Sequence, residues 1–146
     1  MKISTRVRYG VRLMLGLALN YGKGPFFLKD IAKQEDISEK YLSQIIIPLK
    51  TVGLVNSFRG AHGGYSLAKL PSQVTIKAIV EALEGELTLV GPVKDSSVYS
   101  NASIAVTHEL WSNLKDKMSE TLDEATLEDL VKKYNGQDGK TLMYNI

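Results

Sequence analysis

Apolar residues recur at helical spacing in the first part of the chain. Between residues 5 and 21 they fall three or four positions apart, which is typical of a helix with one face turned to a core: Val7, Val11, Met14, Leu15, Ala18 and Leu19. Gly22 and Gly24 follow and favour the end of this helix. Residues 27–33 predict a short second helix, and residues 36–38 have about the length of a turn into a third.

A third amphipathic segment begins at Ser38, whose hydroxyl can cap a helix. Its apolar positions again lie three and four residues apart: Tyr41, Leu42, Ile45, Ile46 and Leu49. Polar residues fall outside this stripe and are free to contact something other than the core: Glu39, Lys40, Ser43, Gln44 and Lys50. Gly53 supplies the left-handed stop expected at the helix end.

Two β-prone runs, residues 54–58 and 65–68, follow and predict a hairpin. The tip between them, residues 59–64, is rich in glycine, which permits positive φ and close approach of the backbone to another surface. Arg59 on such a thin tip suits the narrow, negative minor groove of DNA. Helix, short helix, turn, third helix and hairpin together predict a winged helix-turn-helix, with the third helix in the major groove.

The second half of the chain predicts further helices. Residues 74–83 form a compact helical pattern with Thr75 as its cap and Gly85 as its stop, whereas residues 88–103 have the composition of a loop. A long helix is expected over residues 103–122. Its apolar stripe comprises Ile104, Thr107, Leu110, Trp111, Leu114, Met118 and Leu122.

So long an apolar stripe needs a partner. The same helix of a second subunit would cover it economically, and twofold symmetry would then place two third helices on adjacent major-groove faces. We therefore expect dimerisation through Ile104, Leu110, Trp111, Leu114, Met118 and Leu122. Packing of the stripe on its own domain is the alternative.

The end of the chain predicts a short helix and a tail. Residues 126–129 resemble an N-terminal cap for a helix over residues 127–134, and the polar residues 135–139 predict a flexible linker. The apolar residues 142–146 suggest a docking tail, with a frayed or self-packed terminus as the alternative.

The predicted protein is therefore mainly α-helical with a small β-hairpin wing. Residues 1–85 would form the winged helix-turn-helix DNA-binding domain. Residues 86–134 would contain a loop, the long dimerisation helix and a short final helix. Residues 135–146 would form the linker and the apolar docking tail.

Charge is unevenly distributed between the two halves. Residues 1–75 carry 11 Lys and Arg against 4 Asp and Glu, a net charge of +7, whereas residues 76–146 carry 7 against 12, a net charge of −5. A polyanion should therefore meet the N-terminal half, with salt-sensitive affinity. Chance partitioning of solvated surface charge is the alternative.

Composition excludes several classes of protein. The chain has no cysteine, so disulfides, thiol nucleophiles and cysteine-ligated metal sites are excluded. It also lacks an apolar run of about 18 residues and an apolar N-terminal signal core, so we expect a soluble cytoplasmic protein. No Ser/His/Asp arrangement, metal-ligand cluster or phosphate-binding loop is present, so we expect neither an enzyme nor a cofactor nor a metal.

The motifs in this order resemble the IscR/NsrR/CymR family of bacterial winged-helix regulators, most closely its CymR-type branch, which lacks cluster cysteines. The resemblance spans nearly the whole chain and rests on residues 1–5, 8–10, 37–42, 53–55, 59–61, 63–65, 83–85, 110–111 and 126–130. It implies a homodimer that binds a dyad-symmetric operator in double-stranded DNA, with the third helix in the major groove and the wing in the minor groove.

Carried over residue by residue, the resemblance places the DNA readers at Ser38, Tyr41, Gln44 and Arg59. Gln44 can form two hydrogen bonds with an adenine edge, whereas Ser43, at a position often occupied by glutamate in this family, cannot accept from cytosine as a carboxylate does. The expected DNA contacts also include Thr5, Lys40, Gly60, His62 and Gly63. For each of these residues, an exposed side chain without a role is the alternative.

The resemblance also bears on iron. Cluster-binding members carry three cysteines in the loop before the long helix, but here Ala105 occupies the place of the last cysteine. His108 stands where the iron–sulfur member has a histidine ligand. One imidazole cannot hold a cluster, so iron–sulfur sensing is disfavoured and His108 is expected to face solvent or an interface.

The tail resembles that of CymR-type members, which repress genes of cysteine and sulfur acquisition and bind cysteine synthase. The resemblance implies that Tyr144, Asn145 and Ile146 dock in the synthase, with the terminal carboxylate in its amino-acid pocket and O-acetylserine competing. Two alternatives stay open. The same regulator could sense a small molecule directly, in residues 91–105 or at the dimer interface, or the chain could be an adaptor that no longer binds DNA.

Overall fold

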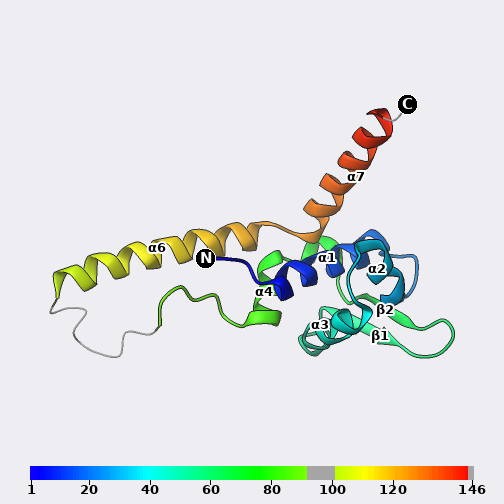
Figure 1. The fold of residues 1–146 in the computed structure, drawn as a ribbon, viewed down its shortest axis with the longest axis horizontal. Helices are drawn as coiled ribbons and strands as arrows, with labels where there is room; N and C mark the ends of the chain where they lie inside the picture. Colours follow the sequence, from blue (N-terminus) through cyan, green and yellow to red (C-terminus); the bar gives the residue numbers. More distant parts are fainter. Residues whose placement is uncertain (92–100, 145–146) are drawn as a thin grey trace.

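Four α-helices, a short 3-10 helix and a hairpin form the N-terminal part of the molecule. The computed structural model describes residues 1–91 and 101–144, with side chains described up to residue 137. The elements, in chain order, are α1 (Thr5–Leu19), α2 (Leu28–Glu35), α3 (Glu39–Thr51), β1 (Val55–Phe58), β2 (Gly64–Leu67), a 3-10 helix (Pro71–Gln73), α4 (Ile76–Glu84), α6 (Ala102–Glu124) and α7 (Leu127–Tyr144) (Figure 1). The predicted winged helix-turn-helix with a long C-terminal helix is confirmed.

The core lies between α1, α2, α3 and α4. Leu13, Met14 and Leu17 of α1 are buried against residues of the other helices, which include Ile31, Leu42, Ile45, Leu49 and Ile79. The stripe predicted for α1 is correct in part. Val7, Met14 and Ala18 are buried, but the prediction left out Leu13 and Leu17, because α1 is covered on more than one side.

A glycine allows α4 to approach α1. Gly10 is buried, and a Cβ built on it would overlap the Leu83 side chain of α4 and lie 3.5 Å from Ile45 of α3. The three helices therefore meet at one point, and any larger residue at position 10 would push Leu83 aside.

The hairpin is antiparallel, with Val55 paired to Leu67 at its base and Phe58 paired to Gly64 at its far end. Val55 and Leu67 are buried, whereas the rest of β1 is exposed. The free edge of β2 is held by the segment before α2, since Phe26 and Tyr65 exchange backbone hydrogen bonds of 2.8 and 2.9 Å. The wing is thus anchored at its base and projects at its tip.

The longest helix has little cover. None of the 23 residues of α6 is buried, and α6 extends away from the body of the molecule, packing on α4 (Figure 1). Leu110 is 57% exposed and Trp111 42% exposed. Asn101 caps α6 by accepting from the backbone N–H groups of Ser103 and Ile104, a cap that the sequence analysis did not identify.

The junction between α6 and α7 is tied back to the start of α4. Ile76 donates its backbone N–H to Ala125 at 2.9 Å, and Leu127 donates to Val74 at 2.9 Å. Leu127 is fully buried and belongs to the core of the N-terminal part. This places α7 against α1.

The final helix is longer than predicted. It runs from Leu127 to Tyr144, so the expected helix over residues 127–134 followed by a flexible linker at 135–139 is wrong. The glycines at 136 and 139 each weaken a helix by only about 1 kcal/mol, which an already nucleated helix can absorb. Asn145, Ile146 and the side chain of Tyr144 lie outside the described residues, as do positions 92–100 of the predicted loop.

A reciprocal cap begins α7. The Asp129 carboxylate accepts from the Thr126 backbone N–H at 3.0 Å, and the Thr126 hydroxyl accepts from the Asp129 backbone N–H at 3.2 Å. The backbone hydrogen bond from Thr126 lowers the pKa of Asp129 below its ordinary value, and the Thr126 side chain lowers it further. The charged form of Asp129 therefore favours the folded state.

We predict that Asp129→Asn lowers the midpoint of thermal unfolding at pH 7. Because the folded-state pKa of Asp129 is depressed, this carboxylate contributes stability above its unfolded pKa, and the contribution is lost as pH falls through the folded value. The difference from the wild type should therefore shrink below about pH 4. Asp123→Asn removes an exposed carboxylate of α6 and is the control. A difference that stays constant from pH 7 to pH 3 would contradict the prediction.

Candidate nucleic-acid interface

The turn between α2 and α3 sets the direction of α3. Asp36 ends α2 in the left-handed region with φ of 52°, which a short polar residue tolerates. The backbone N–H of Ile37 then donates to Ala32 at 3.0 Å, and the Ile37 side chain is buried. Ser38 caps α3, its hydroxyl accepting from the Tyr41 backbone N–H at 3.3 Å. The predicted turn at residues 36–38 is therefore present.

The two faces of α3 differ as its sequence predicts. Its inward face is buried in the core: Leu42, Ile45, Ile46 and Leu49. Its outward face is exposed: Lys40, Ser43, Gln44, Ile47 and Lys50. Tyr41 lies between the two and is half-buried.

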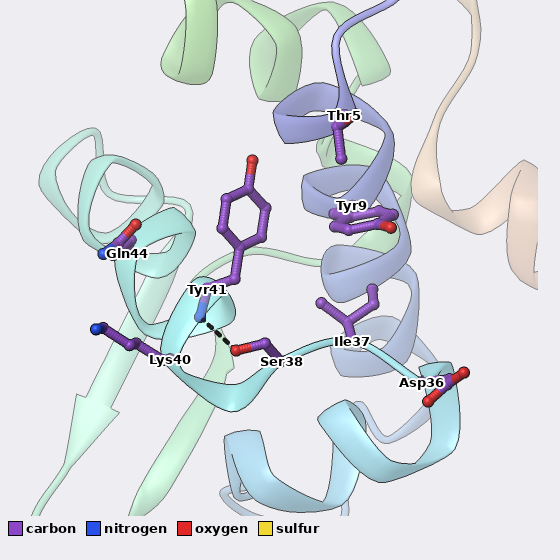
Figure 2. Close-up of a pocket in the computed structure, with 8 residues that line it drawn as sticks. All are labelled: Thr5, Tyr9, Asp36, Ile37, Ser38, Lys40, Tyr41 and Gln44. Atoms are coloured by element: carbon purple, nitrogen blue, oxygen red, sulfur yellow. Dashed lines mark hydrogen bonds between the residues drawn. The ribbon is translucent and has the colours of Figure 1, made fainter.

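A shallow hollow of about 510 Å³ lies between the N-terminal half of α1 and the start of α3 (Figure 2). Its lining brings together residues from both helices and the turn before α3: Thr5, Tyr9, Asp36, Ile37, Ser38, Lys40, Tyr41 and Gln44. Five of these belong to the predicted set of DNA contacts, although Thr5 lies far from the others in sequence. Tyr9 also lines the hollow, although it was not among the predicted DNA contacts.

A second hollow separates α3 from the wing. It is lined by residues of α3 and the wing that include Glu39, Ser43, Lys50, Arg59, Gly60 and Gly63. Lys29 of α2 also lines it, stacked over the Phe27 ring at 5.3 Å from its centroid. Lys29 was not among the predicted DNA contacts, because only the fold brings α2 beside the wing. His62 is exposed at the tip and does not line this hollow.

Several cations on this side of the molecule form no ion pair with the acidic residues that the structure describes. Ion pairs among the described residues join Arg12 to Glu35, Lys77 to Glu81 and Lys132 to Glu128. Within that same part of the chain, four side chains of this surface therefore form no ion pair: Lys29, Lys40, Lys50 and Arg59. Unpaired cations spread over a helix and a hairpin suit a polyanion with regularly spaced charges.

Backbone geometry explains the glycines of the wing. Gly60 has φ of 93°, and its carbonyl accepts from the Gly63 backbone N–H at 3.0 Å to close the tip. A Cβ on Gly63 would lie 2.5 Å from the Phe58 carbonyl oxygen. Gly64 combines φ of 126° with a Cβ position 2.7 Å from the Phe26 carbonyl oxygen. The backbone of the tip thus folds closely on itself at Gly60 and Gly63, and the segment before α2 packs closely on Gly64.

The stripe predicted for dimerisation lies on α6. Ile104, Leu110 and Trp111 are exposed, whereas Leu114, Met118 and Leu122 are half-buried. A further hollow lies between α6 and residues 86–91 and is lined by Glu86, Trp111, Ser112, Lys115 and His108 among others. His108 is half-buried there. No helix in residues 1–91 or 101–144 is long and apolar enough to cross a membrane.

Comparison with known proteins supports the nucleic-acid assignment. A family model described as Rrf2, an iron-dependent transcriptional regulator, matches residues 3–133. The chain is 40% identical over 144 residues to the HTH-type transcriptional regulator CymR of Bacillus subtilis (strain 168), and the match covers 99% of each protein.

Solved structures show the same likeness. The structure of CymR, the global cysteine regulator of B. subtilis, matches with a TM-score of 0.79 and 41% identity over 91% of this chain and 98% of that one. The oxidized form of Staphylococcus aureus CymR matches with a TM-score of 0.73 and 37% identity over 90% of this chain and 96% of that one.

The residues of this chain do not fit the iron of that family description. The chain contains no cysteine, and across the described ranges no three potential ligands from His, Asp and Glu come together. His108 shares its hollow with Glu86 and with Lys115, and the positive charge of Lys115 would repel a metal ion there. No part of the function proposed below therefore involves iron.

Proposed function

The chain belongs to the Rrf2 family of transcriptional regulators, and from this we propose that it is a homodimeric repressor that binds a dyad-symmetric operator and controls genes of cysteine and sulfur metabolism. The observation that carries the DNA-binding part is the surface formed by α3 and the wing, where exposed polar groups lie beside cations that form no ion pair with the described part of the chain. We call this surface, which contains Lys40, Gln44, Lys50 and Arg59, the reading surface.

The reading surface has groups for two kinds of contact. Gln44 is exposed on α3 and presents an amide that can pair with an adenine edge in the major groove. Arg59 is exposed on the wing, beside a tip of glycines thin enough for a minor groove. Lys40 and Lys50 are placed for phosphates, which position the protein without reading sequence. Thr5, Ser38, Tyr41, Gly60, His62 and Gly63 complete the proposed DNA contacts.

Dimerisation is proposed through α6. At 1.5 Å per residue its 23 residues extend roughly 35 Å. Its apolar stripe is exposed at Ile104, Leu110 and Trp111 and only half-buried at Leu114, Met118 and Leu122. Large apolar side chains in a continuous row on a projecting helix favour a second copy as the partner, since a twofold axis buries the same stripe of both subunits.

Control of sulfur metabolism is supported by the relatives. The B. subtilis protein that is 41% identical to this chain is a global cysteine regulator. We further propose that the tail Tyr144, Asn145 and Ile146 binds cysteine synthase, which would act as the sensor of O-acetylserine. The resemblance of the tail to CymR-type members carries this part.

Direct sensing of a small molecule is the second candidate. The hollow beside α6 supports it, since Trp111, Lys115 and His108 line a space of about 530 Å³. A ligand bound there would touch both the segment that follows α4 and the proposed dimer helix. Titrating operator binding with candidate metabolites, with no second protein present, separates this candidate from sensing through a synthase.

We predict that Gln44→Ala and Lys40→Ala weaken DNA binding in different ways. An operator is first selected from random duplex DNA, and Kd is then measured for it and for a scrambled duplex. Gln44→Ala should raise the operator Kd by about tenfold and leave the scrambled Kd unchanged, because it removes a base contact. Lys40→Ala should weaken both and reduce the salt slope by about 1. Equal weakening of both duplexes by Gln44→Ala would exclude the base-reading role.

Replacing Leu110 by lysine should convert the dimer to a monomer. Leu110 is exposed in the single chain, so Leu110→Lys leaves folding intact but places a charge in the proposed interface. Sedimentation at micromolar concentration measures the mass. Leu70→Lys is the matched control, since Leu70 is 47% exposed and lies outside α6. A Leu110→Lys protein that stays dimeric would place the interface elsewhere.

Removing Asn145 and Ile146 should abolish binding to the cognate cysteine synthase. A titration compares the full-length chain with one that ends at Tyr144, each with and without O-acetylserine. Full-length binding that O-acetylserine displaces would support the synthase as the sensor, because the terminal carboxylate and the metabolite would compete for one pocket. Unchanged binding after truncation would refute the tail as the docking segment while leaving the DNA-binding proposal intact.

A further inference from the structure

A continuous chain of side-chain contacts connects the end of α2 with the reading surface. It comprises Glu35, Arg12, Tyr9 and Tyr41, and we call it the Arg12 chain. The Arg12 guanidinium donates to the Glu35 carboxylate at 3.0 Å from Nε, with Nη2 at 2.9 Å from the same oxygen, and Nη2 also donates to the Glu35 carbonyl at 2.5 Å. Two elements, α1 and the end of α2, are thus fixed to each other at the turn into α3.

The same guanidinium holds an aromatic ring. The Arg12 Cζ lies 5.4 Å from the centroid of the Tyr9 ring, within the range of a cation–π contact. The Tyr9 ring in turn meets the Tyr41 ring edge-to-face, with centroids 5.7 Å apart and an angle of 88° between the planes. Figure 2 shows Tyr41 extending from α3 beside Tyr9 of α1.

Only arginine can make this set of contacts. Its planar fork pairs with Glu35 while its face lies on Tyr9, and a lysine ammonium has neither the fork nor the face. The Arg12 and Glu35 side chains are 42% and 27% exposed, and ion pairs at such exposure contribute little to stability. The importance of Arg12 therefore lies in the geometry that it imposes on Tyr9.

Within the Arg12 chain, Tyr41 is the residue that contacts DNA in the proposed function. It lines the hollow between α1 and α3 together with Lys40 and Gln44, and its hydroxyl has no hydrogen-bond partner among the residues that the structure describes. A phenol held by its ring and free at its hydroxyl can donate to a phosphate or a base edge. Arg12 does not line that hollow, so any influence of Arg12 on DNA passes through its neighbours.

We propose that Arg12 is a positioning residue for DNA recognition, which holds Tyr9 and, through it, Tyr41 in the orientation that contacts the operator. This inference rests on the proposed function. A Tyr41 ring fixed before binding loses no further rotamer freedom when DNA arrives, so the contact adds fully to operator affinity. Without Arg12, Tyr9 is released and the Tyr41 ring must be ordered at the expense of binding.

A set of variants tests the proposal. Arg12→Ala removes all contacts, and Arg12→Lys keeps the charge but removes the fork and the stacked face. Tyr41→Phe removes the hydroxyl, and it is combined with each Arg12 variant. Arg6→Ala, on the exposed side of the same helix, removes an equal charge without disturbing the Arg12 chain. Kd is measured for the selected operator and for a scrambled duplex, together with the salt slope and the unfolding midpoint.

The expected result is a loss of operator affinity that depends on Tyr41. Arg12→Lys and Arg12→Ala should raise the operator Kd by about tenfold, within the range of coupling between residues in contact. For Arg12→Lys, the Kd for scrambled DNA and the salt slope should stay unchanged. In the Tyr41→Phe background the Arg12 variants should have little further effect. Arg6→Ala should leave the preference for the operator intact.

Three outcomes would overturn the proposal. Wild-type operator affinity in both Arg12 variants would show that the chain of contacts does not act on DNA binding. Effects of Arg12 and Tyr41 variants that simply add would show that Arg12 acts independently of Tyr41. A wild-type protein that prefers no DNA sequence would contradict the proposed function itself, and this inference with it.

Discussion

The burial of α1 among α2, α3 and α4 is the contact on which the rest of the molecule depends. Leu13, Met14 and Leu17 have almost no exposed surface, and Gly10 lets Leu83 and Ile45 approach the same helix. Because α1 touches every other helix of the N-terminal part, it fixes their mutual orientation. The reading surface is a consequence of that arrangement: α3 can present Gln44 and Lys40 outward only while Leu42, Ile45 and Leu49 are held inward.

The same packing gives the two halves of the reading surface different support. The start of α3 is positioned by side chains, through the cap at Ser38 and the contact of Tyr41 with Tyr9. The wing is positioned by backbone, through the pairing of Tyr65 with Phe26 and through glycines that leave no room for a side chain. A substitution at the start of α3 should therefore weaken its positioning only in part. A substitution at Gly63 or Gly64 should disrupt the backbone of the whole tip.

The two C-terminal helices are packed on the core at their junction, but most of α6 is exposed. Leu127 enters the core, and the backbone bonds of Val74 and Ile76 to the junction of α6 and α7 hold both helices to the DNA-binding part. Away from that junction the stripe of α6 becomes exposed, at Ile104, Leu110 and Trp111. The proposed dimer helix is thus in direct contact with α4, whose Leu83 packs at Gly10 of α1.

Local pattern was enough to predict the helices, the turn before α3, the hairpin and which residues of α3 are exposed, because each depends on spacing within a few residues of the chain. The stop glycines at positions 53 and 85 also adopt positive φ as expected. The length of α7 escaped prediction, because the polar residues and glycines at 135–139 were expected to end the helix, whereas a helix already begun at its cap continues through them. The tertiary structure alone shows the contacts of Lys29, Tyr9 and Arg12. Lys29 lies beside the wing, and Tyr9 and Arg12 contact residues of α3 and α2. Contacts between residues so distant in sequence form only when the core brings those elements together.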